Sequence, residues 1–317
     1  MNRLENKLPR CHKPGWPKYK PPNEPLLKKP IPPMTQIVGI VCKESVNYSP
    51  RDTIVIACES QYTIGGSGEK VTDAQKMSTI KFSDGKEVLI AQAGNTELSA
   101  RAVRFMSEIA KDRLLNGEFC VANIAEEAIN RVRSEMLAMM QPRDYSIEEQ
   151  KQLFGDEENN FALMIGHFYD VPRETGSAFA TGGNPRLWTI SLYSPIAVKE
   201  FPYAALGTGS RLARFNLSKS HFKKIKWELA VPKAIHVIEQ VKGSDVYCDG
   251  TVRVGIVERH GVQFYGEDLV REFTSEIKRI QRKLDSEYEA ELIATVNRVA
   301  TKRKKAAVRW QRKRSEI

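Results

Sequence analysis

The sequence predicts an α+β fold in which sheets of paired strands are covered by helices. Two observations lead to this expectation. Strand-sized apolar runs alternate along the chain with pairs of helical segments, in the order strands, two helices, strands, two helices, strands. The helices are grouped in pairs, which favours sheets covered by helices over alternating βα units. No repeat of about 20–50 residues is present, which argues against a solenoid or propeller.

The first half of the chain contains three predicted strands and two predicted helices. Residues 35–42 are apolar on both sides of the strand, which predicts burial on both faces. Residues 53–58 form the hairpin partner, and residues 88–93 form the third strand. Apolar residues at helical spacing predict one helix from Asn95 or Thr96 to about Leu114 and a second over residues 121–139. In the second helix we expect Met136, Met139 and Met140 to fill the core. Residues 141–160 are polar and are expected to be mostly a connection.

The second half repeats this pattern and ends in a long helix. The predicted strands are 161–168, 185–193, 203–209, 251–258 and 262–265, with helices near 209–217 and 230–242. Residues 267–301 are expected to be one helix with an apolar stripe. This stripe permits coiled-coil contact with a neighbour, although packing on the same chain is the default.

The charge is concentrated in two tails. The chain of 317 residues has a net charge of +10, of which residues 1–33 contribute +6 and residues 301–317 contribute +7, leaving −3 for the middle. Such tails are solvated polymers in one interpretation. In the other they attract nucleic acid or another acidic surface, although neither interleaved aromatic residues nor a recognised nucleic-acid fold accompanies them.

The remaining composition favours a protein of the cytoplasm without a cofactor or a metal. The longest apolar runs are strand-sized, so no transmembrane helix is expected. The first 33 residues lack the apolar segment of a signal peptide. The five cysteines are widely spaced and form no CxxC pair, which favours a reducing compartment.

Three regions follow from these patterns. Residues 1–34 are basic and contain nine of the sixteen prolines within positions 1–33, so we expect a pro-segment, a disordered arm or sequence upstream of the true start codon. Residues 35–266 form the predicted domain, and residues 267–317 form the long helix with its basic tail. Because Met34 precedes the small Thr35, we hypothesise that translation begins at Met34.

Four residues together provide the groups that a threonine nucleophile requires. A hydroxyl needs an adjacent base, and the α-amine of Thr35 would serve if Thr35 were the first residue of the mature chain, because that amine has a pKa of about 8. Lys76 would stabilise charge on the hydroxyl oxygen, and Glu59 would hold Lys76. The backbone N–H of Gly94, after the third strand, would receive the oxyanion. The set suits amide hydrolysis.

These segments, in this order, resemble the β-subunit family of the proteasome and the related peptidase subunits of bacterial ATP-dependent proteases. The matching segments are Thr35-Gln-Ile-Val-Gly39, Ala57-Cys-Glu-Ser-Gln61, Ala74-Gln-Lys-Met77, Ala93-Gly-Asn95, Gly207-Thr-Gly209 and Ser244-Asp-Val-Tyr-Cys-Asp-Gly250. They cover about residues 35–265. The resemblance adds Thr208 as a supporting hydroxyl and Asp245 as an acid beside the site.

The resemblance implies a four-layer αββα sandwich of the N-terminal nucleophile hydrolase type and threonine peptidase activity. It also implies a self-assembled homo-oligomeric ring, protein or peptide substrates and an ATP-dependent unfoldase as partner.

The chain departs from the family pattern near the nucleophile. Glu59 replaces an aspartate, Gln61 an arginine, Cys248 a serine and Asp249 a glycine. Glu59 is one methylene longer, so it is expected to reach Lys76 only if the backbone shifts or the rotamer folds back. These changes motivate a rival interpretation, an inactive structural or regulatory ring protein. In the simplest interpretation, Lys76 and Glu59 form no more than a surface ion pair.

Overall fold

The structure is a computed structural model that describes residues 35–42, 52–63, 70–71, 75–139, 146–155, 160–169, 184–219, 227–244, 248 and 250–315. The chain divides into two units, residues 1–30 and 31–317, and all described residues belong to the second. The predicted region 1–34 therefore lies outside the described residues.

One five-stranded antiparallel sheet contains strands from both ends of the predicted domain. Its order is β10-β1-β2-β11-β12. The strands are β1 (Gln36–Cys42), β2 (Thr53–Glu59), β10 (Tyr203–Gly207), β11 (Val252–Glu258) and β12 (Gly261–Phe264). Every residue of β1 and β2 is buried, because apolar side chains point to both faces of these strands. The prediction that the first strand is buried on both sides is confirmed.

A second five-stranded antiparallel sheet has the order β5-β6-β7-β8-β9. Its strands are β5 (Met77–Lys81), β6 (Glu87–Gly94), β7 (Phe161–Tyr169), β8 (Asn184–Ser191) and β9 (Val198–Glu200). A short pair, β3 (Tyr62–Thr63) with β4 (Lys70–Val71), is separate from both sheets.

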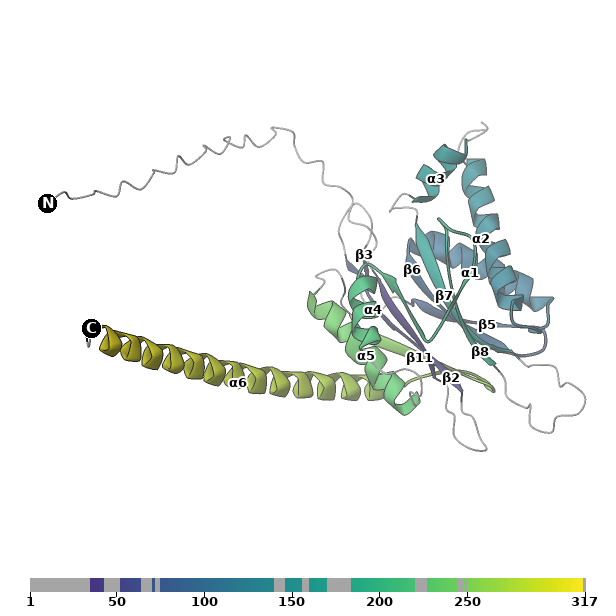
Figure 1. The fold of residues 1–317 in the computed structure, drawn as a ribbon. Coiled ribbons are helices and arrows are strands. Elements are labelled where there is room, and N and C mark those ends of the chain that lie inside the picture. Colours follow the sequence, from purple (N-terminus) through teal and green to yellow (C-terminus); the bar gives the residue numbers. More distant parts are fainter. Residues whose placement is uncertain are drawn as a thin grey trace, which may run out of the picture. The chain divides into compact units, whose positions relative to one another are not determined.

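Three apolar clusters hold these elements together. The first joins the second sheet to α1 (Thr96–Lys111) and α2 (Cys120–Met139). The second joins the first sheet to α4 (Ser210–Ser218), α5 (Trp227–Ser244) and the start of α6 (Glu267–Ser315). Figure 1 shows α1 and α2 beside the strands of the second sheet and α4 and α5 beside those of the first. The third lies between the two sheets, where Ile37 and Ile56 of one sheet pack with Leu89 and Met164 of the other. The α+β expectation is confirmed.

The structure corrects the polar connection predicted for residues 141–160. Within it, α3 (Ile147–Gly155) forms because Ser146 and Glu149 make a capping box. The Glu149 amide donates to Ser146 Oγ at 3.2 Å, and the Ser146 amide donates to Glu149 Oε2 at 2.9 Å. Strands β5 and β9 were not predicted, because five and three residues carry too little periodicity.

The long helix α6 is confirmed and extends beyond the predicted end, to Ser315. Only its first turns pack on the rest of the chain: Val270 is buried, and Phe273 and Ile277 lie against the second cluster. Farther along, Leu284 and Tyr288 are 54% and 68% exposed. The default expectation of packing on the same chain therefore holds for the start of the stripe, and α5 still contacts α6 at Gln281, whose Oε1 accepts from Gln240 Nε2 at 3.3 Å. Beyond Gln281 the described side chains 282–295 and 298 are all exposed.

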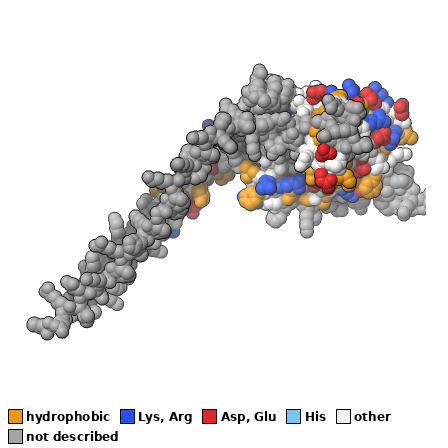
Figure 2. All heavy atoms as spheres, turned by 90° about the horizontal axis from the view of Figure 1, so that it is seen from above, with side chains coloured by type: hydrophobic (Ala, Val, Ile, Leu, Met, Phe, Trp, Pro, Cys, Tyr) orange, Lys and Arg blue, Asp and Glu red, His pale blue; other side chains and the backbone are white. Residues whose placement is uncertain are grey.

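The surface of the body mixes both signs of charge. Figure 2 draws one face, on which Lys and Arg side chains lie among Asp and Glu. Several of these groups form ion pairs, such as Arg101–Glu97 and Arg131–Glu127. The mixture agrees with the small net charge of the middle of the chain.

Two further expectations concern membrane spans and methionines. Among the described residues, no helix is long and apolar enough to cross a membrane. Met106 is buried and Met136 packs against the first cluster, whereas Met139 is 68% exposed at the last residue of α2. The core role expected for Met139 is therefore wrong, because the helix has left the sheet by that point. Met140 lies outside the described residues.

Candidate functional site

Thr35 lies directly before β1 and is held tightly by the neighbouring strand. Only 2% of it is exposed. The end of β10 approaches its backbone so closely that a Cβ on Gly207 would lie 1.4 Å from the Thr35 carbonyl oxygen. Gly207 also has a φ of +99°, a conformation that favours glycine. A glycine at 207 is therefore required to place Thr35 at this edge of the first sheet.

Glu59 is the last residue of β2, and the strand register brings it next to Gln36. Ile37 pairs with Cys58, so the following residue of β2 lies beside the start of β1. The Gln36 amide donates to Glu59 Oε1 at 3.1 Å, and the Gln61 amide donates to Oε2 at 2.6 Å. Both carboxylate oxygens are thus bound by backbone N–H groups at a position with 0% exposure.

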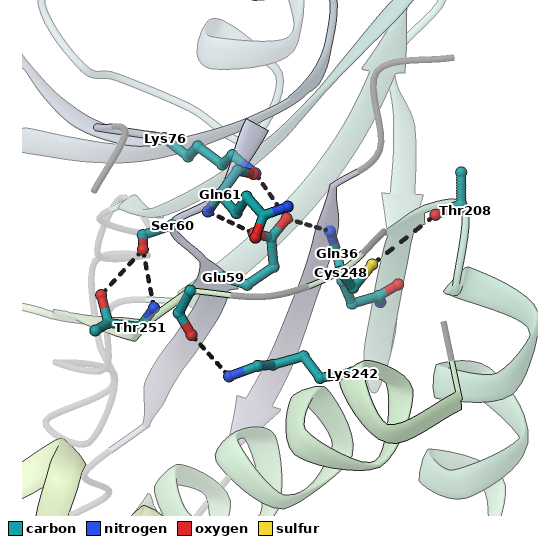
Figure 3. Close-up of polar contacts among 10 residues, drawn as sticks. Gln36, Glu59, Ser60, Gln61, Lys76, Thr208, Lys242, Cys248 and Thr251 are labelled. Carbon is teal, nitrogen blue, oxygen red and sulfur yellow. Dashed lines mark hydrogen bonds and ion pairs between the residues drawn. The ribbon is translucent and has the colours of Figure 1, made fainter. Parts of the chain in front are cut away.

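Lys76 precedes β5 and reaches from the second sheet to Glu59 of the first (Figure 3). Its ammonium donates to Glu59 Oε1 at 2.6 Å and to the Gln61 carbonyl oxygen. The two side chains are 2% and 0% exposed, which excludes a surface ion pair. Glu59 Oε1 also accepts from the Gln36 amide, so the ammonium lies within two hydrogen-bond lengths of the residue after Thr35.

Burial and the ion pair act in opposite directions on Glu59. Burial raises the pKa of Glu59 above its ordinary value, while the Lys76 ammonium and the two backbone amides work to lower it. The neighbouring Cys58 thiol has a pKa raised to about 12, mainly by burial. Cys58 is therefore an inert thiol at neutral pH.

Gly94 ends β6 beside the same part of the second sheet. The Gln92 amide donates to the Lys76 carbonyl at 2.9 Å, which places Gly94 two residues from the position opposite Lys76. Gly94 has a φ of +94°, and a Cβ there would lie 2.4 Å from the Asn160 carbonyl oxygen. Glycine is thus required at this turn, and α1 begins directly after it, with the Asn95 side chain accepting from the Leu98 amide.

Thr208 and Asp245 complete the set predicted from the sequence. Thr208 follows Gly207, the residue that touches the Thr35 carbonyl, and its Oγ1 lies 4.0 Å from Cys248 Sγ. Asp245 and Asp249 lie outside the described residues. The structure therefore brings Glu59 and Lys76 together with the residue next to Thr35 and places Thr208 beside the residue that contacts Thr35.

The architecture has known relatives among solved structures, although no family model and no curated protein sequence matches the chain. Anbu from Pseudomonas aeruginosa, solved as a helical assembly, aligns with a TM-score of 0.57 at 15% identity, covering 80% of this chain and 96% of that one. A Gly-1 mutant of Anbu from Hyphomicrobium sp. strain MC1 gives 0.56 at 14%, covering 80% and 96%. Anbu, the ancestral beta-subunit, from Yersinia bercovieri gives 0.55 at 13%, covering 80% and 97%.

The fold is proteasome-related. At these identities the likeness concerns the fold, and the roles of individual residues rest on the geometry of this chain.

Within this proteasome-related fold, the backbone roles of Gln36 and Gln61 were not predicted from the sequence, although Gln61 was noted as a departure from the family pattern. Gln36 and Gln61 are 0% and 1% exposed, and both contribute backbone amides to the carboxylate. The side-chain atoms Gln36 Oε1 and Gln61 Nε2 are buried and have no hydrogen-bond partner among the described residues. A backbone donor carries no sequence signal, because every residue except proline has one.

The described residues suggest no metal centre. No group of three or more His, Cys, Asp or Glu side chains in the described ranges is arranged to hold a metal ion. Among the described residues around Glu59, the buried ion pair consists of one carboxylate and one ammonium.

Proposed function

We propose that this protein is a threonine peptidase that hydrolyses peptide bonds through Thr35. The supporting observation is the buried Lys76–Glu59 pair, which is tied by Glu59 Oε1 to the amide of Gln36, the residue after Thr35. A lysine brought into the interior in this way has a high desolvation cost. Burial raises the pKa of its partner Glu59, and carboxyl groups perturbed in this way are concentrated at functional sites.

The proposal includes the finer form of the fold. This form is the four-layer αββα sandwich of the N-terminal nucleophile hydrolases, and it is supported by two sheets joined by an apolar layer, each with helices packed against it. In this arrangement the nucleophile is the first residue of the mature chain. Residues 1–34 are therefore removed, or never made, before the protein is active.

The reaction follows from the groups around Thr35. Thr35 Oγ attacks the peptide carbonyl while its α-amine accepts the hydroxyl proton, and the proton then passes to the departing amine. An ester to Thr35 remains, which water hydrolyses by the same proton relay. The Gly94 amide donates to the oxyanion in both steps. Thr208 and Asp245 support the network.

In this proposal, Glu59 fixes the position of the Lys76 ammonium so that it can donate to the nucleophile. An ammonium has three N–H donors, of which the described residues Glu59 and Gln61 engage two. The third serves the Thr35 oxygen as negative charge develops on it. Glu59 itself is held by two backbone amides, which fix both oxygens of its side chain.

We further propose that the protein assembles with copies of itself. The Pseudomonas relative was solved as a helical assembly. A ring or helix of subunits would enclose the sites and admit unfolded protein or peptide substrates, for which an ATP-dependent unfoldase is the fitting partner. Cytoplasmic localisation is part of the same proposal.

A second candidate function is an assembly subunit without catalysis. It is favoured by the hydrogen bonds of Lys76, which among the described residues go to Glu59 and Gln61 rather than to Thr35. It is also favoured by Gln61 and Cys248, which stand where the family has an arginine and a serine.

Intact-mass analysis with a covalent threonine-directed probe tests the proposal. Protein beginning at Thr35 is incubated with a peptide epoxyketone or a β-lactone, and its mass should rise by one probe molecule per chain. Thr35→Ala should abolish labelling and lower peptide hydrolysis by about three orders of magnitude. Thr35→Ser, which keeps an oxygen nucleophile, is the matched control and should retain labelling. Absence of labelling in the Thr35 protein would favour the second candidate.

A further inference from the structure

The segment after Glu59 is pressed against Gly250. Gly250 has a φ of +87°, and a Cβ there would lie 2.8 Å from Ser60 Oγ and 3.0 Å from the Gln61 amide nitrogen. Gln61 is the residue whose amide and carbonyl bind Glu59 and Lys76. The position of Gly250 therefore limits where the Glu59–Gln61 segment can lie.

Thr251 forms three hydrogen bonds with Ser60 of the same segment. The Ser60 amide donates to the Thr251 carbonyl at 2.9 Å, and the Thr251 amide donates to Ser60 Oγ at 3.0 Å. The two hydroxyls lie 3.0 Å apart within hydrogen-bond distance. Ser60 is 0% exposed, so little water competes for these bonds.

Gly250 is in turn held by α5. Lys242, in the last turn of this helix, donates from Nζ to the Gly250 carbonyl at 2.7 Å (Figure 3). The same ammonium pairs with Glu239 Oε1 at 2.8 Å. Their side chains are 13% and 8% exposed, so the contact is well shielded from solvent.

Glu239 links this contact to α6. Its second oxygen, Oε2, pairs with Lys278 Nζ at 2.9 Å. Lys278 is 56% exposed and sits in the part of α6 that begins to leave the body. One nearly buried carboxylate thus bridges a lysine of α5 and a lysine of α6.

We infer that Lys242 is a positioning residue for the candidate site. It acts through Gly250 and Ser60 on Glu59, and Glu239 orients it while connecting it to α6. We name the series Lys278, Glu239, Lys242, Gly250 and Ser60 the positioning relay. The inference rests on the proposed function in that Glu59 is taken as part of the catalytic network.

A charge is needed at 242 for a physical reason. Removing the ammonium leaves the Gly250 carbonyl without this donor, and among the described residues it leaves Glu239 with the exposed Lys278 as its remaining ionic partner. The Gly250–Thr251 segment then loses its anchor to α5, and Ser60 and Gln61 gain freedom to move. Lys76 would lose a fixed acceptor at the Gln61 carbonyl.

Hydrogen exchange of the full chain tests the relay without any need for activity. In Lys242→Met, which keeps the length of the side chain, amide exchange should rise about tenfold in peptides covering residues 57–61 and 250–254, while α1 and β6 stay unchanged. Lys242→Arg, which can donate to both acceptors, should restore protection. Arg271→Met is the matched control, because Arg271 lies on α6 in an exposed pair with Glu267.

Steady-state kinetics of peptide hydrolysis, measured on protein beginning at Thr35, tests the effect of the relay on catalysis. Lys242→Met should lower kcat for peptide hydrolysis about tenfold with little change in KM, and Lys242→Arg should recover it. Exchange at 57–61 equal to that of Arg271→Met, or an equal rise in all regions, would overturn the inference. Raised local exchange in a protein that hydrolyses nothing would support the relay and count against the proposed peptidase.

Discussion

At the residue scale, one carboxylate organises the site. Glu59 accepts from the amides of Gln36 and Gln61 and from the Lys76 ammonium, so three segments of the chain meet at its two oxygens. The pair is worth little as an attraction in isolation, because both groups lose water on burial. Its main effect is geometric, since each partner becomes costly to move once the other is in place.

Removing one charge of this pair should therefore destabilise the protein more than expected from the loss caused by removing both charges. We expect Lys76→Met or Glu59→Gln alone to lower the free energy of unfolding by about 3–5 kcal/mol, and the double variant to lower it by less than the sum. Urea unfolding of the four proteins gives the coupling.

The matched control for this cycle is Lys283→Met, which removes a pair with Glu287 whose partners are 71% and 61% exposed. It should change stability by about 1 kcal/mol or less. Strictly additive losses at Lys76 and Glu59 would contradict the buried-pair description.

His167 predicts a pH dependence of stability. It is fully buried, and its Nε2 accepts from Trp188 Nε1 at 3.1 Å, which requires an unprotonated nitrogen. Burial lowers the pKa of His167 from 6.5 to about 4. The unfolded chain therefore binds the proton first, and this stability is complete above pH 6.5 and is lost as the pH falls towards 4.

The size of this loss follows from about 1.4 kcal/mol per pKa unit, which gives about 3 kcal/mol by pH 4. Urea unfolding at pH 7 and pH 4.5 measures most of it. His167→Gln keeps an acceptor for Trp188 without titrating, so its stability should differ less between the two pH values. An identical pH dependence in wild type and variant would refute the assignment.

At the element scale, α6 consists of two stretches with different surroundings. Val270, Phe273 and Ile277 pack on the domain, whereas the described residues 282–295 and 298 are all exposed. A helix of this length without tertiary contacts is held by its own hydrogen bonds and by pairs such as Lys283–Glu287. Coiled-coil contact of the exposed stripe with a neighbour stays a prediction.

Truncation separates the two stretches. A chain that ends after Gln281 should melt within about 2 °C of the full chain under conditions where the protein is monomeric, because few contacts are lost. A chain that ends after Gly266 should lose several kcal/mol, since it removes three packed apolar side chains. Differential scanning calorimetry compares them. Equal melting temperatures for the two truncations would contradict the packing of Val270, Phe273 and Ile277.

At the scale of the whole domain, the two sheets approach closely enough to select small residues between them. A Cβ on Gly39 of β1 would lie 2.6 Å from Met164 Sδ and 2.9 Å from Leu187 Cδ2, both in the other sheet. These two side chains are 0% exposed, so they would have to shift within the packed core to accommodate a Cβ. This contact keeps the strand that follows Thr35 packed against the sheet that carries Lys76.

Gly39→Ala should consequently lower the free energy of unfolding by about 1–3 kcal/mol through overpacking. Gly243→Ala is the control, because a Cβ in that last turn of α5 meets nothing within 4 Å and alanine is the better helix former. Guanidinium unfolding distinguishes them, and a neutral Gly39→Ala would show that the sheets can separate slightly.

The long periodic segments were predictable from the sequence, and the short ones were not. Strands β1 and β2 and helices α1, α2 and α6 carry enough apolar repeats to define their period. Strands β5 and β9 do not, and α3 was missed although Ser146 and Glu149 had the spacing of a capping box.

The sequence by itself determined the types and order of the main elements, because period and burial pattern act locally. It also singled out Thr35, Glu59, Lys76 and Gly94 as candidates from their chemistry. Only the tertiary structure decided that Lys76 and Glu59 form a buried pair beside Gln36, because the strand register and the packing of one sheet on the other set that contact. The anchoring of Gly250 by Lys242 depends equally on tertiary placement, since backbone carbonyls carry no sequence signal.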